Sequence, residues 1–313
     1  MRVLQALALA CVAAACNGDA KGSDAPRRDV PVRRATAFNG NAAYAYAKAQ
    51  FDFGPRVPGS AAAQKGGDWI IAQMRTRADT VIVQSWTHTT AAGKKLPMRN
   101  ILARFRPEVA ERVLYVTHWD SRPVSESASD STQRKLPVPG ANDGASGVGL
   151  FVALGDVLRT TKPNVGVDLL FVDGEDYGQF GPPEIDVLIG SKYFAAHLPS
   201  ADYRPLYGVV WDMIGDTDLR IPYEMNSFTR APEVVAKVWQ LAAELGHGNI
   251  FVQESGGAIT DDHIPLLNAG MRVIDVIDLD YPPHHTPQDT MDKISARSLG
   301  IVGDIATALV TRE

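Results

Sequence analysis

Carboxyl and imidazole side chains follow several apolar segments of this sequence. In LFVDGEDYG, residues 170–178, an apolar run leads directly into Asp173, Glu175 and Asp176, and no basic residue stands among them. An unpaired carboxylate is costly to bury, so this turn is either solvated or faces a cation that the neighbouring residues do not supply. Carboxylates in such a place can hold a metal ion or transfer protons.

Comparable residues stand near the ends of other apolar segments. They are His118, Trp119 and Asp120 after residues 113–117, Asp143 in PGANDGASG, Asp212 after residues 207–211, and His284 and His285 beyond residues 273–277. Each has a structural explanation when taken alone, because Asp143 could cap the helix that follows it, and Glu175 and Asp176 could form a solvated turn. Their recurrence at successive segment ends instead predicts one shared site.

Alternating strand and helix patterns would bring these residues to one edge of a sheet. Strand-like runs cover residues 80–86, 99–105, 113–117, 167–172, 207–211 and 273–277, and helical patterns cover residues 42–51, 61–77, 146–159, 191–197, 232–245 and 295–312. This order predicts an α/β fold, a three-layer sandwich with a mixed, mainly parallel central sheet. In such sheets the ligand crevice lies at the carboxyl ends of the strands.

Zinc is the cation that these side chains suit. Both cysteines of the chain, Cys11 and Cys16, stand near its start, so a metal in the remaining residues must be held by histidine, aspartate and glutamate. Zinc accepts imidazole nitrogen and carboxylate oxygen, and catalytic zinc sites keep one position open. We therefore expect a zinc site at the sheet edge.

The first 37 residues differ in composition from the rest. Residues 1–16 contain an apolar run too short to span a bilayer, which is typical of a secretory signal peptide. The sequence AAAC at residues 13–16 resembles a bacterial lipoprotein cleavage box, which would make Cys16 a lipidation site. Residues 17–37 are typical of a flexible tether, and residues 38–313 of a single catalytic domain. We expect export to the periplasm or cell envelope, with membrane anchoring if Cys16 carries lipid.

Composition suits a globular enzyme and argues against a nucleic-acid partner. Of the 313 residues, 45% are apolar, which is ample for a large core. The net charge is −5, and no basic stripe interleaved with aromatic residues occurs. Four histidines have no context comparable to that of His118, His284 and His285, and we expect them to be structural or surface residues: His88, His197, His247 and His263. Residues 126–135 are expected to form an exposed loop.

Several motifs resemble those of one enzyme superfamily. THWDS, PGANDGASG, DGED, WDMIGD, TDDHIP and HHTPQDT occur in the order and approximate spacing of the zinc aminopeptidase superfamily, which also contains the glutaminyl-peptide cyclotransferases. The resemblance covers nearly all of the chain after the tether. TDDHIPLL and HWDSRP look more like the cyclases, including bacterial glutaminyl cyclase-like lipoproteins, than like ordinary aminopeptidases.

The resemblance implies a role for each motif residue. Asp143, Asp176 and His285 match the ligands of one zinc ion, and Glu175 matches the glutamate that transfers a proton. In the cyclases, the residues that correspond to Asp212 and Asp261 form a hydrogen-bonding pair near that proton.

An aminopeptidase would use some of the same residues differently. His118 and Asp212 would then bind a second zinc ion, and Asp120 would orient His118. The chain also departs from the cyclase pattern, because His284 stands where many cyclases have tryptophan and Asp275 where some have histidine. We expect the substrate pocket to be bordered by Trp119, Tyr281 and His284.

Three hypotheses follow for the function. The first is a zinc-dependent glutaminyl-peptide cyclotransferase, an acyltransferase that converts an N-terminal glutamine of a peptide or protein to pyroglutamate with release of ammonia. The alternative is a zinc metallo-aminopeptidase of the same superfamily with two zinc ions. The third is a binding protein without catalysis, which the presence of Glu175 disfavours because binding alone would not need it.

Overall fold

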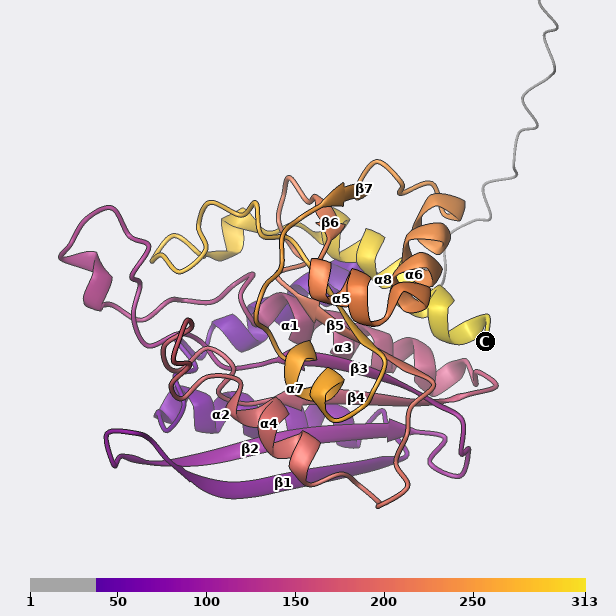
Figure 1. The fold of residues 1–313 in the computed structure, drawn as a ribbon, viewed down its shortest axis with the longest axis horizontal. Coiled ribbons are helices and arrows are strands. Elements are labelled where there is room, and N and C mark those ends of the chain that lie inside the picture. The colour runs from indigo at the N-terminus through magenta and orange to yellow at the C-terminus, as the bar shows by residue number, and fades with distance from the viewer. Residues whose placement is uncertain (1–37) are drawn as a thin grey trace, which may run out of the picture. The chain divides into compact units, whose positions relative to one another are not determined.

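The structure is a computed structural model that describes residues 38–313 (Figure 1). The expected signal peptide, tether and lipidated Cys16 lie outside the described residues. Within residues 38–313, no helix is both long and apolar enough to cross a membrane.

A six-stranded sheet with the order β1-β2-β4-β3-β5-β8 forms the central layer. Its strands are β1 (Thr80–Thr89), β2 (Lys95–Phe105), β3 (Arg112–His118), β4 (Gly166–Val172), β5 (Tyr207–Asp212) and β8 (Val273–Ile277). The last four are parallel to one another, whereas β1 pairs with β2, and β2 with β4, in antiparallel register. A separate parallel pair joins β6 (Ile221–Tyr223) to β7 (Phe251–Ser255). The predicted mixed, mainly parallel sheet is confirmed.

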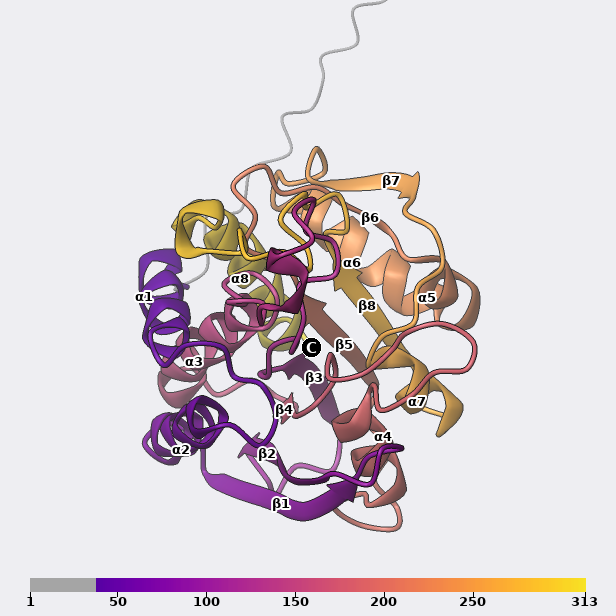
Figure 2. The ribbon, with the colours of Figure 1, turned by 90° about the vertical axis from the view of Figure 1, so that its left-hand side faces the viewer.

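Helices cover both faces of the sheet, which gives three layers (Figure 2). One face carries α1 (Gly40–Phe51), α2 (Ala61–Arg75), α3 (Ala145–Thr160) and α8 (Ala296–Thr311). The other carries α4 (Ile189–Ala196), α5 (Met225–Arg230) and α7 (His263–Asn268), while α6 (Pro232–Glu244) contacts β8, α5 and α8. Two short 3-10 turns, η1 (Gln133–Lys135) and η2 (Met291–Lys293), lie in long connections.

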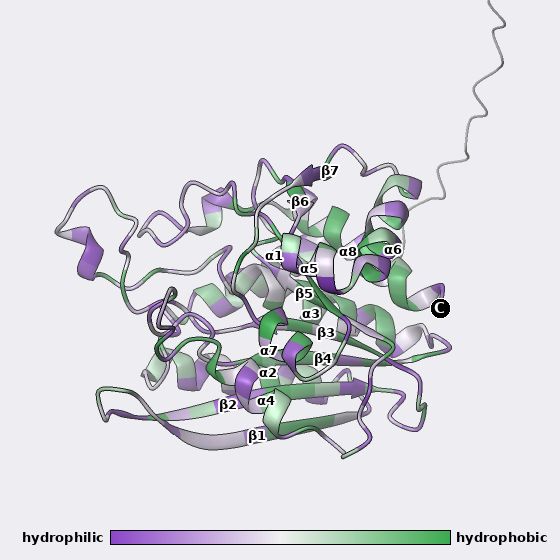
Figure 3. Cartoon of the chain, viewed as in Figure 1, coloured by the Kyte–Doolittle hydropathy of each residue, from purple (hydrophilic) through white to green (hydrophobic). Residues whose placement is uncertain are grey.

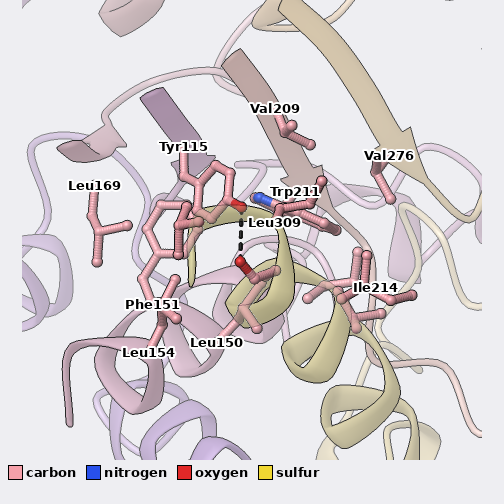
Figure 4. Close-up of a cluster of buried hydrophobic side chains, with 14 of the residues drawn as sticks. Tyr115, Leu150, Phe151, Leu154, Leu169, Val209, Trp211, Ile214, Val276 and Leu309 are labelled. Atoms are coloured by element: carbon pink, nitrogen blue, oxygen red, sulfur yellow. Dashed lines mark hydrogen bonds between the residues drawn. The ribbon is translucent and has the colours of Figure 1, made fainter. Parts of the chain in front are cut away.

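The hydrophobic core lies between the central strands and the helices around α3. Every residue of β3 and β4 is buried, as expected for parallel strands covered on both faces, and the interior of the ribbon is largely green in Figure 3. Tyr115, Phe151 and Trp211 pack edge-on or stacked at the centre of this core (Figure 4). The Tyr115 hydroxyl donates a hydrogen bond of 2.8 Å to the carbonyl of Ala306 in α8. This hydrogen bond links β3 to α8 across the core.

Some elements differ from those expected from the sequence. The hairpin strands β1 and β2 are longer than predicted and pair from Thr80 with Arg104 to Thr89 with Lys95. Among residues 38–313, two strands and two α-helices were not predicted: β6, β7, α5 and α7. Each has at most six residues, and such short segments are set by tertiary contacts and show no readable hydrophobic period.

Glu224 ties two of these short elements together. Its carboxylate accepts hydrogen bonds from the backbone of Asn226 and Ser227 at the start of α5, and from the amide of Ile259. The Nε2 atom of His263 in α7 lies 3.2 Å from the same carboxylate. Burial alone would raise the pKa of Glu224, but the nearby His263 and the hydrogen bonds from Ser227 lower it to about 2.

Replacing Glu224 with glutamine is therefore expected to give a pH-dependent loss of stability. A depressed pKa stabilises the fold above the ordinary pKa, and this contribution disappears as the pH falls towards the folded-state value. The Glu224→Gln variant should lose about 2 kcal/mol of unfolding free energy at neutral pH, because hydrogen bonds to a charged acceptor are lost. Urea unfolding at several pH values tests this: the difference from wild type should shrink as the pH approaches about 2. A difference independent of pH would contradict it.

Candidate metal centre

The carboxyl ends of the parallel strands open into a cavity of about 590 Å³. Residues of the predicted site border it, namely Asp143, Glu175, Asp176, Asp212, Asp261, His284 and His285. The acidic turn after β4 is not solvated, because Glu175 and Asp176 are only 7% and 1% exposed. The carboxylates of Glu175 and Asp176 are therefore buried beside one another.

Asp143 and Asp176 both lie beside His285 in this cavity. The Nε2 atom of His285 lies 3.3 Å from Oδ2 of Asp176 and 3.6 Å from Oδ2 of Asp143. Both of those buried oxygens lack a hydrogen-bond partner. Ligands of a tetrahedral zinc ion, each about 2.0 to 2.1 Å from the metal, stand roughly 3.3 Å apart. The donor types, the two distances from His285 and the unpartnered oxygens fit a zinc ion. A ligand atom of His284 also lies within 4.8 Å of those of Asp143 and His285.

A second group of donors adjoins the first. The Nε2 atom of His118 lies 3.1 Å from Oδ1 of Asp143 and 3.1 Å from Oδ1 of Asp212. The ligand atoms of these three residues all lie within 4.8 Å of one another. Asp143 places one oxygen near each group, so its carboxylate stands between the two groups of donors.

The loop before α3 fixes Asp143 through its backbone. Gly144, not Asp143, is the N-cap of α3, and no side chain caps this helix. Gly144 has a φ of 103°, and a Cβ atom there would lie 2.9 Å from Cε1 of His118, so glycine is required at this close approach. The buried guanidinium of Arg56 donates to the carbonyls of Pro139 and Gly140 in the same loop. Asp143 is therefore free of the capping role that its sequence position allowed.

Asp289 completes the support of this loop and was not singled out from the sequence. Its carboxylate accepts the backbone amides of Asn142 at 2.8 Å and Asp143 at 3.2 Å, and the hydroxyl of Tyr281 at 2.7 Å. Burial, and then the charge of Asp143, raise the pKa of Asp289 to about 7. Asp289 could have been found from the sequence because it belongs to the HHTPQDT motif, in which a role was predicted only for the two histidines.

Asp120 organises the acidic turn and also faces His118. Its two oxygens accept the backbone amides of Glu175 at 3.1 Å and Asp176 at 3.3 Å. Its Oδ1 atom lies 3.5 Å from Nδ1 of His118, which is consistent with the expected orienting contact. One buried carboxylate thus connects the end of β3 to the turn after β4.

Glu175 has the environment of a group that exchanges protons. Burial, followed by the neighbouring charge of Asp176, raises the pKa of Glu175 well above its usual range, although His118 opposes the shift. The Oε2 atom of Glu175 lies 3.9 Å from Nδ1 of His118. A carboxyl group with raised proton affinity can take up and return a proton near neutral pH.

Further buried carboxyl groups lie next to the cavity, namely those of Asp212, Asp261 and Asp275. Burial raises the pKa of Asp212 to about 7, with Asp261 adding to the shift and His118 opposing it. Asp261 and Asp275 share a cluster with His263 in which the ligand atoms lie within 4.8 Å of one another. Neither oxygen of Asp275 has a hydrogen-bond partner, and burial followed by the charge of Asp261 raises its pKa. His263, expected to be structural or exposed, is fully buried beside Asp275.

The structure places the three expected pocket residues differently. His284 borders the cavity, and burial together with the charge of His285 lowers its pKa to about 4, which keeps its imidazole neutral. Trp119 instead lines a separate cavity of about 330 Å³ beside Arg99. Tyr281 is buried against Asp289 and does not line the metal cavity. The apolar wall comes from other residues: Phe180, Met213, Ile259, Ile277 and Leu279.

Arg122 and Glu126 also border this cavity, although neither was predicted as a site residue. Nη1 of Arg122 lies 2.6 Å from Oδ1 of Asp176, and Oε1 of Glu126 lies 3.0 Å from Nδ1 of His285. Burial would raise the pKa of Glu126, but hydrogen bonds with His285 and Arg122 lower it to about 2. Arg122 stands in the quoted HWDSRP motif, whereas no motif marked Glu126.

Comparisons with known proteins agree with this geometry. Residues 100–310 match peptidase family M28. The chain is similar to the crystal structure of Porphyromonas gingivalis glutaminyl cyclase, at 36% identity and a TM-score of 0.84, over 88% of this chain and 98% of that one. It is also similar to a Zn-dependent exopeptidase from Parabacteroides distasonis, at 33% identity and a TM-score of 0.84, over 90% of this chain and 100% of that one.

A curated relative agrees in the type of metal but is a longer protein. The chain is 32% identical over 179 residues to a probable zinc metalloprotease of Leptosphaeria maculans. The match covers 53% of this chain and 38% of that protein, so the chain spans about two fifths of this relative's length.

Proposed function

Because the chain belongs to peptidase family M28, we propose that it is a zinc-dependent glutaminyl-peptide cyclotransferase. Its substrates are peptides or proteins with an N-terminal glutamine, which it converts to pyroglutamate with release of ammonia. The observation that carries the proposal is the set of buried carboxyl groups in one cavity, in which Glu175, Asp212 and Asp261 stand next to a zinc-type donor set. The similarity to a bacterial glutaminyl cyclase over nearly the full length of both chains supports it.

The reaction forms one bond and breaks one. The α-amine nitrogen of the glutamine bonds to the carbon of its own side-chain amide, and the bond from that carbon to the amide nitrogen breaks. A proton must leave the attacking amine and reach the departing nitrogen, which leaves as ammonia. No water molecule enters the products, so the protein must supply a proton carrier and exclude water.

Glu175 is the proton carrier in this proposal. It borders the cavity, and its raised pKa suits a carboxyl group that takes a proton from the amine and returns it to the leaving nitrogen. Asp212 and Asp261 lie beside it in the cavity lining and serve as hydrogen-bonding partners that hold the proton relay in place.

The metal site supplies the second part of the chemistry. We propose one zinc ion held by Asp143, Asp176 and His285, which as a Lewis acid would polarise the side-chain amide of the substrate. His118 then acts as a buried partner of Asp143 and Asp212 and not as a ligand. His284, with a neutral imidazole at the cavity wall, replaces the tryptophan of many cyclases as a border of the pocket.

A zinc aminopeptidase is the second candidate function. The donors His118, Asp143 and Asp212, with ligand atoms within 4.8 Å of one another, favour it because they could hold a second zinc ion. Glu175 would then deprotonate an attacking water molecule. The similarity to a Zn-dependent exopeptidase of Parabacteroides distasonis supports this candidate as well.

A substrate comparison with a metal count separates these functions. The purified protein is incubated with a glutamine-initiated peptide and, separately, with aminoacyl anilides, and zinc is measured by elemental assay. Release of ammonia without shortening of the peptide, with one zinc per chain, supports cyclisation. Release of a free amino acid supports the aminopeptidase. Neither activity, together with no bound zinc, would leave a binding protein on this fold.

We also propose that the protein is exported to the periplasm or cell envelope. The support is the apolar, signal-like sequence of residues 1–16 and the AAAC box, with Cys16 as the lipidation site. Mass analysis of the mature N-terminus tests this: a lipidated Cys16 is expected, whereas an unmodified chain that begins elsewhere would remove the membrane anchor from the proposal.

A further inference from the structure

The connection between β3 and α3 contacts two of the three proposed zinc ligands at the border of the cavity. This connection carries η1, and it lies beside the segment before α8, since Gln133 accepts a hydrogen bond from Gln288 (Figure 1). Its backbone also meets a ligand directly, because the amide of Ser127 donates to the carbonyl of His285. A segment expected to be only an exposed loop therefore contacts the metal site.

Two side chains of this connection close a ring of charged contacts with the ligands. Glu126 accepts from Nδ1 of His285 at 3.0 Å, and Arg122 lies 2.6 Å from the same Oε1 atom of Glu126. Nη1 of Arg122 donates to Oδ1 of Asp176 at 2.6 Å. The ring closes across the proposed metal position, where Nε2 of His285 and Oδ2 of Asp176 are 3.3 Å apart.

This ring decides which atom each ligand presents to a metal. A neutral imidazole carries one N–H group, and a carboxylate at Nδ1 holds that proton there and leaves the lone pair of Nε2 free. Arg122 likewise donates a hydrogen bond to Oδ1 of Asp176, so that Oδ2, which has no hydrogen-bond partner, stays free. The two atoms left free are the ones that face each other.

We propose that Glu126 and Arg122 are positioning residues for the zinc site. Glu126 fixes the tautomer and ring orientation of His285, and Arg122 fixes the rotamer of Asp176 and holds Glu126 in place. The inference rests on the zinc site of the proposed function, but it holds for cyclisation and for hydrolysis alike. The β3–α3 connection is thereby part of the metal site.

A purely structural role predicts a different outcome for the same residues. The side chain of Glu126 is 43% exposed, and ion pairs in contact with solvent contribute little to stability. Removing it should therefore hardly change the unfolding of the metal-free protein. Partners that orient a metal-bound histidine typically change metal affinity about 10- to 100-fold when they are replaced.

The test measures zinc affinity in the absence of substrate. Wild type, Glu126→Ala and Glu126→Gln are compared by competition with a chelator, and the cobalt-substituted proteins by their visible absorption spectra. The exposed Glu111, whose side chain makes no described contact with the site, provides the matched control Glu111→Gln. Thermal unfolding of the metal-free proteins shows whether each variant is folded.

We expect Glu126→Ala to weaken zinc binding about 10- to 100-fold and to alter the cobalt spectrum. Glu126→Gln should lie between Glu126→Ala and wild type, because its amide oxygen can still accept from Nδ1 but carries no charge. Unfolding of the metal-free proteins should be unchanged, and Glu111→Gln should match wild type throughout. Zinc affinity of Glu126→Ala within twofold of wild type, or a wild type that binds no zinc, overturns the inference. Normal zinc results without cyclisation would instead count against the proposed reaction alone.

Discussion

Replacing Glu175 with glutamine is expected to lower kcat for glutamine cyclisation about 10²- to 10⁴-fold, the range typical for loss of a general acid–base group. Glutamine keeps the size of the side chain but cannot carry the proton from the amine to the leaving nitrogen. Because Glu175 is not among the three proposed ligands, zinc content should stay at the wild-type value. Ammonia release under saturating substrate, with an elemental assay on the same sample, measures both quantities.

Measuring kcat and zinc content on the same sample separates loss of proton transfer from loss of the metal. The surface variant Glu111→Gln, which removes the same charge far from the cavity lining, should retain wild-type kcat. If Glu175→Gln kept wild-type turnover with zinc bound, Glu175 would not be the proton carrier. If it lost zinc together with activity, its carboxylate would have to be counted among the ligands.

Replacing Asp143 with alanine is expected to abolish activity by removing the metal. Asp143 offers one oxygen to the group with His285 and the other to the group with His118, so its loss disrupts both neighbouring positions. Replacement of residues that only orient ligands costs about 10- to 100-fold in metal affinity, so loss of a ligand itself should cost at least about 100-fold. Zinc content after dialysis and ammonia release measure the outcome.

The Asp143→Ala variant should still fold. The contacts that hold this loop are backbone ones: the amide of residue 143 donates to Asp289, and glycine occupies position 144. The fully exposed Asp202 provides a matched control, since Asp202→Ala should keep both zinc and activity. Zinc content of Asp143→Ala equal to that of wild type would remove the proposed ligand set.

The position of the site residues at the carboxyl ends of the strands was predictable, because the local sequence determines where each strand ends. Long apolar runs mark the central strands, and polar residues at or just beyond their carboxyl ends must lie at the sheet edge, as Glu175 and Asp212 do. The zinc type followed from the donors, since both cysteines stand outside residues 38–313. The sheet order, by contrast, depends on long-range pairing that no local pattern contains.

Supporting contacts were harder to predict because they join distant segments. Asp289 reaches Asn142 across 147 positions, and Glu126 reaches His285 across 159, so neither contact leaves a local pattern. Trp119 was expected to border the pocket, where His284 stands in place of the tryptophan of many cyclases. Successive side chains at the end of a strand point to opposite faces, which places Trp119 beside Arg99 in a different cavity.

The single carboxylate of Asp120 that accepts both amides of the turn after β4 has a mechanical consequence. Glu175 and Asp176 are consecutive residues on one anchored peptide, so a displacement of the turn carries both side chains along together. Such a displacement would change the distance from these two side chains to a bound substrate more than it would change the distance between them. The proposed proton carrier and the proposed zinc ligand would therefore move together as one rigid unit, and their spacing would be kept.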